Sequence, residues 1–192
     1  YIESLLKEEG ISREESLIVI SPGARSTTKQ WPIENFIEVI KILKKELNVR
    51  IVLVGSQEET YLSQKIKGEV ENIHNFIGKT TIPQLCVILK KAKILITNDS
   101  AVLHCGSAVN IPTIAIFGPT DPIKYGPLAE KSFVLRRMLT CVPCEKAQCR
   151  YGHRKCLKLV KPWEVVEAVR KLMVTDYQLP TTEQVYKRIL VI

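Results

Sequence analysis

Hydrophobic residues along this chain of 192 residues fall into two kinds of segment that alternate. Six short, apolar segments have the length and composition of buried strands. Five longer segments show helical spacing of apolar residues, and the clearest runs from Pro32 to Leu47, where lysines occupy the opposite face. The predicted strands are Leu17–Ser21, Arg50–Val54, Asn72–Ile77, Lys93–Thr97, Pro112–Phe117 and Ser132–Leu135, and the predicted helices are Pro32–Leu47, Gln57–Lys67, Ile82–Ala92, Ser100–Val109 and Pro162–Met173.

This alternation predicts an α/β fold, a Rossmann-like parallel sheet with helices on both faces. We assign residues 1–175 to one domain, which includes a cysteine-rich loop at 141–156. The tail at 176–192 carries a helical pattern over Thr181–Leu190, and we expect it to pack elsewhere than on the main sheet. Residues 1–12 resemble the end of a linker. Because the chain begins at Tyr1 rather than Met, we expect the natural N-terminus to lie upstream.

Polar residues follow the predicted strands, at the edge of a parallel sheet where ligands bind. After the first strand, Ser21–Pro32 contains Gly23 and Ala24, the cations Arg25 and Lys29, several hydroxyls and a helix start. Backbone N–H groups at a helix start, with cations beside them, bind phosphates. The alternative is an ordinary loop with solvated cations.

A second group, Asp99, Ser100, Ala101 and His104, lies where the fourth strand passes into a helix. Asp99 ends the strand, and His104 lies one turn beyond Ser100 on the same face. One interpretation is an anion site at the helix start. The other makes Asp99 a helix cap and His104 a structural residue. A third segment, Gly118–Pro122, is a rigid loop or a plain turn.

These three segments together resemble the ADP-heptose:lipopolysaccharide heptosyltransferase family. The motifs are Pro22-Gly-Ala with Lys29-x-Trp-Pro, Asn98-Asp-Ser-Ala-x-x-His104 and Phe117-Gly-Pro-Thr-Asp-Pro122, in that order. The resemblance implies the C-terminal half of a GT-B glycosyltransferase, which holds the donor. The family transfers heptose from ADP-heptose to the lipopolysaccharide inner core, with inversion and without a cofactor. Its general base and acceptor site belong to an N-terminal domain, so we expect this chain to bind donor without completing transfer.

The resemblance also implies roles for individual residues. Lys29 matches a lysine that grips the donor diphosphate, Gly23, Ala24 and Arg25 lie in the phosphate loop, and Asp99 matches an aspartate that hydrogen-bonds the sugar. Ser100 and Ala101 match residues whose amides meet the phosphates, and His104 matches a histidine near the diphosphate. Glu59 aligns with a glutamate that binds the ribose. The alternative for Glu59 is a first-turn acid that the helix dipole favours.

Four of the six cysteines, Cys141, Cys144, Cys149 and Cys156, form a cluster that also contains His153. Their spacing suits a structural zinc site. Two disulfides or four free thiols are the alternatives. Cys86 and Cys105 stand alone in apolar segments and are expected to be small core residues.

The formal net charge is +8, and eight of the basic residues lie between Arg136 and Lys161 with only one acid, Glu145. Such a patch indicates an anionic partner or a solvated surface. Three alternatives to a heptosyltransferase stay open: a related enzyme with another nucleotide-sugar donor, a zinc-knuckle nucleic-acid-binding module, and a regulator that binds nucleotides. The second lacks exposed aromatics interleaved with the cations, so we expect no nucleic-acid partner. We expect a cytoplasmic protein, with peripheral contact at the inner face of the inner membrane left open.

Overall fold

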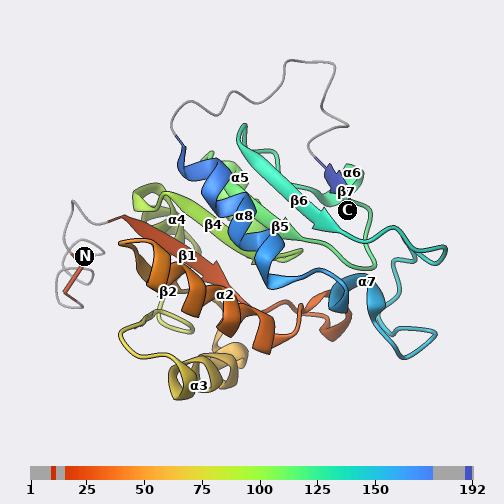
Figure 1. Ribbon diagram of the computed structural model, residues 1–192, viewed down its shortest axis with the longest axis horizontal. Coiled ribbons are helices and arrows are strands. Elements are labelled where there is room, and N and C mark those ends of the chain that lie inside the picture. Colours follow the sequence, from red (N-terminus) through yellow and green to blue (C-terminus); the bar gives the residue numbers. More distant parts are fainter. Residues whose placement is uncertain (1–9, 12–15, 175–188, 192) are drawn as a thin grey trace.

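The computed structural model describes residues 10–11, 16–174 and 189–191 of the chain. Among these residues, seven strands form one sheet in the order β3-β2-β1-β4-β5-β6-β7 (Figure 1). Every neighbouring pair is parallel. The strands are β1 (Leu17–Ser21), β2 (Arg50–Leu53), β3 (His74–Asn75), β4 (Ile94–Asn98), β5 (Thr113–Ile116), β6 (Ser132–Arg136) and β7 (Ile189–Val191).

Helices cover both faces of this sheet. In Figure 1, α2 and α8 lie side by side across the near face, and α4 and α5 lie behind. The helices are α2 (Ile33–Glu46), α3 (Thr60–Glu69), α4 (Ile82–Lys91), α5 (Ala101–Ala108), α6 (Pro122–Tyr125), α7 (Lys155–Lys158) and α8 (Pro162–Met173), with 3₁₀ turns η1 (Thr27–Lys29) and η2 (Gln57–Glu59). The predicted α/β class, with a Rossmann-like parallel sheet, is therefore confirmed.

The first strand, β1, is apolar throughout because it lies between two layers of helices. Ile18 and Ile20 pack into the core beneath α2 and α8, whereas Leu17 and Val19 pack into the core on the α4 and α5 side. A strand between two helical layers has no solvated face, so it needs a continuous hydrophobic run rather than alternation. Chain order reverses between β1 and β4, which lie side by side, and this switch point opens a crevice beyond their carboxyl ends.

Most predicted elements agree with the structure within one or two residues, and β1 and α8 agree at both ends. The differences are local. The predicted Gln57–Lys67 helix begins as the 3₁₀ turn η2, and the predicted strand at 72–77 keeps only His74–Asn75. Two four-residue helices, α6 and α7, were not predicted.

The C-terminal tail differs more. Residues 181–188 lie outside the described residues, as do 1–9 and 12 of the expected linker. Ile189 and Leu190, however, belong to β7, which pairs with β6. The prediction of a helix at these two residues, and of packing away from the sheet, is therefore wrong for the described part of the tail, Ile189–Val191. The physical reason is that β6 would otherwise present a row of unpaired backbone groups along the edge of the sheet.

No helix in the described ranges combines the length and apolar character that crossing a membrane requires.

Candidate functional site

The loop after β1 is fixed at both ends by one buried side chain, that of Asn98. Its amide nitrogen Nδ2 donates to the backbone oxygens of Pro22, at 2.8 Å, and Gly23, at 3.1 Å. Its oxygen Oδ1 accepts from the backbone N–H of Trp31 at 3.1 Å. Because Asn98 ends β4, these bonds tie the β1 loop and the start of α2 to the neighbouring strand.

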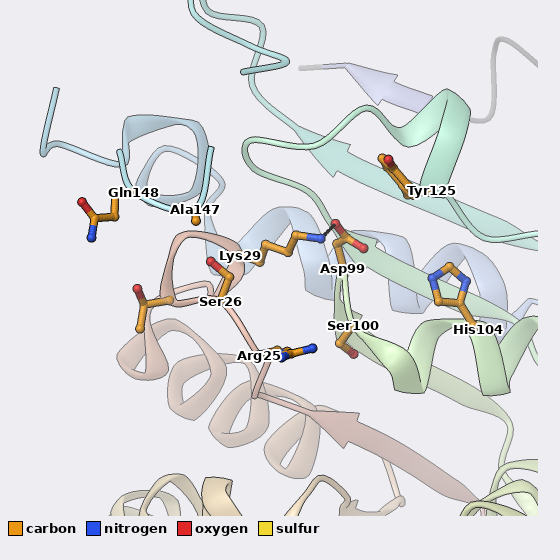
Figure 2. Close-up of a pocket in the computed structure, with 10 residues that line it drawn as sticks. Arg25, Ser26, Lys29, Asp99, Ser100, His104, Tyr125, Ala147 and Gln148 are labelled. Carbon is orange, nitrogen blue, oxygen red and sulfur yellow. Dashed lines mark ion pairs between the residues drawn. The ribbon is translucent and has the colours of Figure 1, made fainter. Parts of the chain in front are cut away.

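Lys29 reaches from this loop to Asp99 at the switch point. The Lys29 Nζ to Asp99 Oδ2 distance is 2.8 Å, and Thr120 Oγ1 donates to the same oxygen at 2.6 Å. The Asp99 side chain is 5% exposed and that of Lys29 is 31% exposed. Figure 2 shows the lysine crossing the middle of a pocket, with Tyr125 above it, and the ring centroid of Tyr125 is 5.8 Å from Nζ.

Ser100, rather than Asp99, is the N-cap of α5, and it makes no side-chain capping bond. The capping alternative for Asp99 is therefore wrong, because its carboxylate is engaged by Lys29 and Thr120 instead. The Ser100 hydroxyl lies 3.2 Å from Thr97 Oγ1. His104, one turn into α5, lies on the same side of the helix and lines the same pocket as Ser100 (Figure 2).

This pocket, which we call the main lobe, has a volume of about 650 Å³. It brings together five residues predicted from the sequence, namely Arg25, Lys29, Asp99, Ser100 and His104. The other four predicted residues, Gly23, Ala24, Glu59 and Ala101, do not line it. Two further lining residues, Ser26 and Thr27, belong to the predicted phosphate loop, and sequence reasoning missed the other three: Tyr125, Ala147 and Gln148. The signal for Tyr125 was present, since Asp121 followed by Pro122 is the start of a helix, α6.

Glu59 lies beside the ends of β1 and β2. Its Oε2 accepts from the backbone N–H of Ser56 at 2.8 Å, within a capping box. A Cβ atom at Gly23 or Gly55 would overlap its carboxylate, so both glycines are needed for this approach. Burial raises the pKa of Glu59 above its ordinary value, and the hydrogen bonds to Ser56 oppose that rise. The Glu59 carboxylate thus lies against Gly23 and Gly55, outside the main lobe.

The cysteine-rich loop forms the remaining wall. Backbone N–H groups of Cys144 and Glu145 both donate to the Pro119 oxygen at 2.9 Å. Thr28 Oγ1 donates to the Lys146 oxygen at 3.2 Å. Farther along, the Arg154 guanidinium donates to the Thr27 oxygen at 2.8 Å. These bonds join the cysteine-rich loop to the segment after β1 and to the segment after β5.

The four clustered cysteines and His153 line a further pocket of about 690 Å³, which shares Gln148 with the main lobe. All six cysteines of the chain are free thiols. Hydrogen bonds from backbone N–H groups, that of Arg154 first, lower the pKa of Cys149, whereas burial raises the pKa of Cys156. Within the described residues, no three His, Cys, Asp or Glu side chains are grouped closely enough to hold a metal. Zinc at Cys141, Cys144, Cys149 and Cys156 stays a prediction.

One member of the predicted basic patch is buried and a second is partly buried. Arg136 is 5% exposed, and burial lowers its pKa. Arg137 forms an ion pair with the buried Glu164 of α8. The solvated patch is therefore smaller than the sequence indicates, because local counting of charges cannot identify side chains that the fold buries.

Comparison with known proteins places this geometry in a family. The family model described as "Glycosyltransferase family 9 (heptosyltransferase)" matches residues 4–155. Lipooligosaccharide heptosyltransferase 2 of Campylobacter jejuni (strain 81116) is 31% identical over 161 residues, which are 81% of this chain and 51% of that protein. Lipopolysaccharide heptosyltransferase 2 of Escherichia coli K12 is 27% identical over 172 residues, 86% of this chain and 49% of that protein.

Solved structures of the same family also resemble this chain. The chain resembles E. coli ADP-heptose lps heptosyltransferase II with a TM-score of 0.78 and 26% identity, over 92% of this chain and 52% of that one. A glycosyl transferase family 9 protein from Veillonella parvula gives a TM-score of 0.80 at 26% identity, over 89% and 49%. The chain spans about half the length of the curated relatives it matches. The likeness to these enzymes is in accord with the expected half of a GT-B fold, and the chain belongs to glycosyltransferase family 9, the heptosyltransferase family.

Proposed function

We propose that this chain is the donor-binding half of an inverting glycosyltransferase that takes heptose from ADP-heptose and adds it to the lipopolysaccharide inner core. The observation that carries the proposal is the convergence of Lys29, Asp99 and the start of α5 on one pocket beyond the carboxyl ends of β1 and β4. Relatives of the chain are named lipopolysaccharide or lipooligosaccharide heptosyltransferases 2 and 3, which supports the same substrate class.

The donor diphosphate is proposed to lie between the η1 loop and α5. Lys29 and Arg25 supply positive charge on one side of the main lobe. On the other side, the first N–H groups of α5, including that of Ala101, have no acceptor within the helix and carry its positive dipole end. Anions bind at such termini, and two cations facing them strengthen the attraction in a partly enclosed pocket.

This arrangement also suits the chemistry of transfer. When the bond between the sugar and the diphosphate breaks, negative charge accumulates on the leaving phosphate. Donors fixed in advance around that phosphate stabilise the charge without reorganising at the moment of reaction. Lys29, Arg25 and the α5 terminus are in position to do so, and His104 adds a further donor one turn along the helix. We therefore assign these residues to leaving-group stabilisation.

Asp99 and Glu59 are proposed to hold the two sugars of the donor. Asp99 carries an acceptor oxygen at the edge of the main lobe, and a sugar hydroxyl placed there shares the carboxylate with Lys29 and Thr120. Glu59 lies beside Gly23 at the end of β1, outside the main lobe, and one carboxylate there suits the vicinal hydroxyls of a ribose. Gly23 contributes by leaving room for that carboxylate, and Ala24 is buried behind the loop rather than facing the donor.

The acceptor and the general base are proposed to come from a partner domain, as the family's two-domain architecture implies. We propose a cytoplasmic enzyme that meets its lipid-linked acceptor at the inner face of the inner membrane. Exposed basic residues of the cysteine-rich loop that do not line the main lobe, such as Arg150, are suited to an acidic surface.

Calorimetric titration of the purified chain with ADP, UDP and a short oligonucleotide tests the proposal. We expect ADP to bind, UDP to bind more weakly and the oligonucleotide not to bind. Incubated alone with ADP-heptose and core acceptor, the chain should show no transfer. Failure to bind ADP would refute the donor assignment, and robust transfer by the chain alone would refute the division of labour between two domains.

A further inference from the structure

The main lobe continues into a second recess of about 290 Å³, which we call the side lobe. Ser26, Lys29, Tyr125 and Ala147 border both lobes, so the two form one cleft with Lys29 between them. The diphosphate and the start of α5 account for the main lobe. The proposed function assigns no ligand group to the interior of the side lobe.

The side lobe has the chemistry of a site for a neutral polyhydroxylated group. Glu145 supplies a carboxylate, Lys146 an ammonium, and Thr28 and Thr120 hydroxyls. Sugar hydroxyls donate to the carboxylate and accept from the ammonium, so one ring engages both. A second phosphate is disfavoured by the negative charge of Glu145. The exposed ring of Tyr125 adds an apolar surface, with a phenol at its tip, against which the carbon face of a sugar can pack.

The backbone of Glu145 is held in an unusual conformation. Its φ angle is 50°, in the left-handed region that non-glycine residues seldom occupy. Two hydrogen bonds fix it there, from the N–H groups of Cys144 and Glu145 to the Pro119 oxygen. Strain of this kind is retained where the surrounding structure enforces it, and it is common at ligand sites. Here it places the Glu145 side chain along the wall of the side lobe.

The side lobe also adjoins the sugar end of the donor site. Thr120 lines the side lobe, and its hydroxyl donates to Asp99 Oδ2 at 2.6 Å. A sugar held by Asp99 therefore has the side lobe as its next neighbour.

We propose that the side lobe is a recognition subsite for the glycosyl group of the donor, and that Glu145 and Lys146 of the cysteine-rich loop select which sugar is accepted. This inference rests on the proposed function, since it assumes a nucleotide sugar whose diphosphate lies in the main lobe. It gives the loop at 141–156 a role, as the segment that contacts the donor sugar.

Titration with ADP and with ADP-heptose separates sugar recognition from nucleotide binding. We expect Glu145→Gln to weaken ADP-heptose binding about tenfold, the loss that follows from one charge-assisted hydrogen bond, and to leave ADP binding unchanged. Lys124→Met is the matched control. Lys124 lines neither lobe, but its Nζ lies 3.3 Å from Glu145 Oε1, so the variant removes the same ion pair and keeps the carboxylate. In Lys124→Met, the affinities for ADP and for ADP-heptose should each change less than about twofold, because an exposed ion pair contributes little.

Lys146→Met, compared with Lys155→Met on the exposed start of α7, repeats the test independently of Glu145. Thermal unfolding of each variant confirms that it is folded. Equal losses for ADP and ADP-heptose, no loss for either ligand, or the same loss in Lys124→Met would overturn the subsite while leaving the proposed function intact. A wild-type chain that binds neither ligand would overturn the proposed function itself.

Discussion

Replacing Lys29 with alanine tests the placement of the diphosphate most directly. Lys29 Nζ is 2.8 Å from Asp99 Oδ2 and about a third exposed, so its charge is partly neutralised and partly hydrated before any ligand arrives. A charge-assisted hydrogen bond contributes about 1.5–3 kcal/mol. Competition from Asp99 and from water puts Lys29 near the lower end, about 1.5 kcal/mol, which corresponds to roughly a tenfold loss of ADP affinity.

Calorimetric titration with ADP and with adenosine measures this loss. Lys29→Ala should lower the affinity for ADP and leave that for adenosine unchanged, because only the diphosphate meets the lysine. Lys45→Ala, on the exposed face of α2, removes the same charge away from the cleft and should change neither. Equal ADP affinity in wild type and Lys29→Ala, or equal losses for both ligands, would mean that the diphosphate lies elsewhere.

Asp99→Asn tests the other partner of the Lys29–Asp99 ion pair. The variant removes a carboxylate 2.8 Å from the same ammonium, so Lys29 is freed for the diphosphate and ADP should bind at least as tightly as in wild type. ADP-heptose should instead lose affinity, since Asp99 is proposed to accept from the sugar. Weaker ADP binding in this variant would contradict the competition described here.

Further predictions concern Glu59 and the cysteines. Because folding raises the pKa of Glu59, the stability of wild type relative to Glu59→Gln should be greatest at acidic pH and should fall as the pH rises above the ordinary value of 4.5. Urea unfolding of both proteins across pH 4–8 measures the direction of this change. Gly23→Ala should displace the Glu59 carboxylate and weaken adenosine binding, and it should add little in a Glu59→Ala background, which titration of both single variants and the double variant measures. Elemental analysis with a thiol count should find the four cysteines at 141–156 protected, through bound metal or through disulfides; four freely reactive thiols without metal would contradict this prediction.

The sequence predicted the parts of this molecule that depend on local pattern. The Pro162–Met173 helix was found because its apolar residues repeat at helical spacing behind a proline at the first turn. The tail was not, because Ile189 and Leu190 become a strand only when β6 offers its edge, a contact between distant parts of the chain. Helical spacing over so short a segment is a weak preference that such pairing overrides.

The candidate site also contains residues that could be predicted from the sequence and residues that could not. Arg25, Lys29 and Asp99 could be predicted because each follows a strand whose carboxyl end must lie at the same edge of the sheet. Ala147 and Gln148 could not, because they reach the main lobe only through hydrogen bonds that tie the cysteine-rich loop to Pro119 and Thr28. No local pattern in the loop indicates which strand end it will contact.

The amide of Asn98 has a consequence for the thermodynamics of ligand binding. By bonding to Pro22, Gly23 and Trp31 together, it closes the base of the phosphate loop into a ring whether or not a ligand is bound. Ordering a free residue costs about 1–2 kcal/mol of conformational entropy. Since this loop is already ordered when the chain folds, its cost falls on folding rather than on association. Nucleotide affinity should therefore vary with the contacts that loop residues such as Arg25 and Lys29 offer to the ligand, and little with the length of the loop between its anchors.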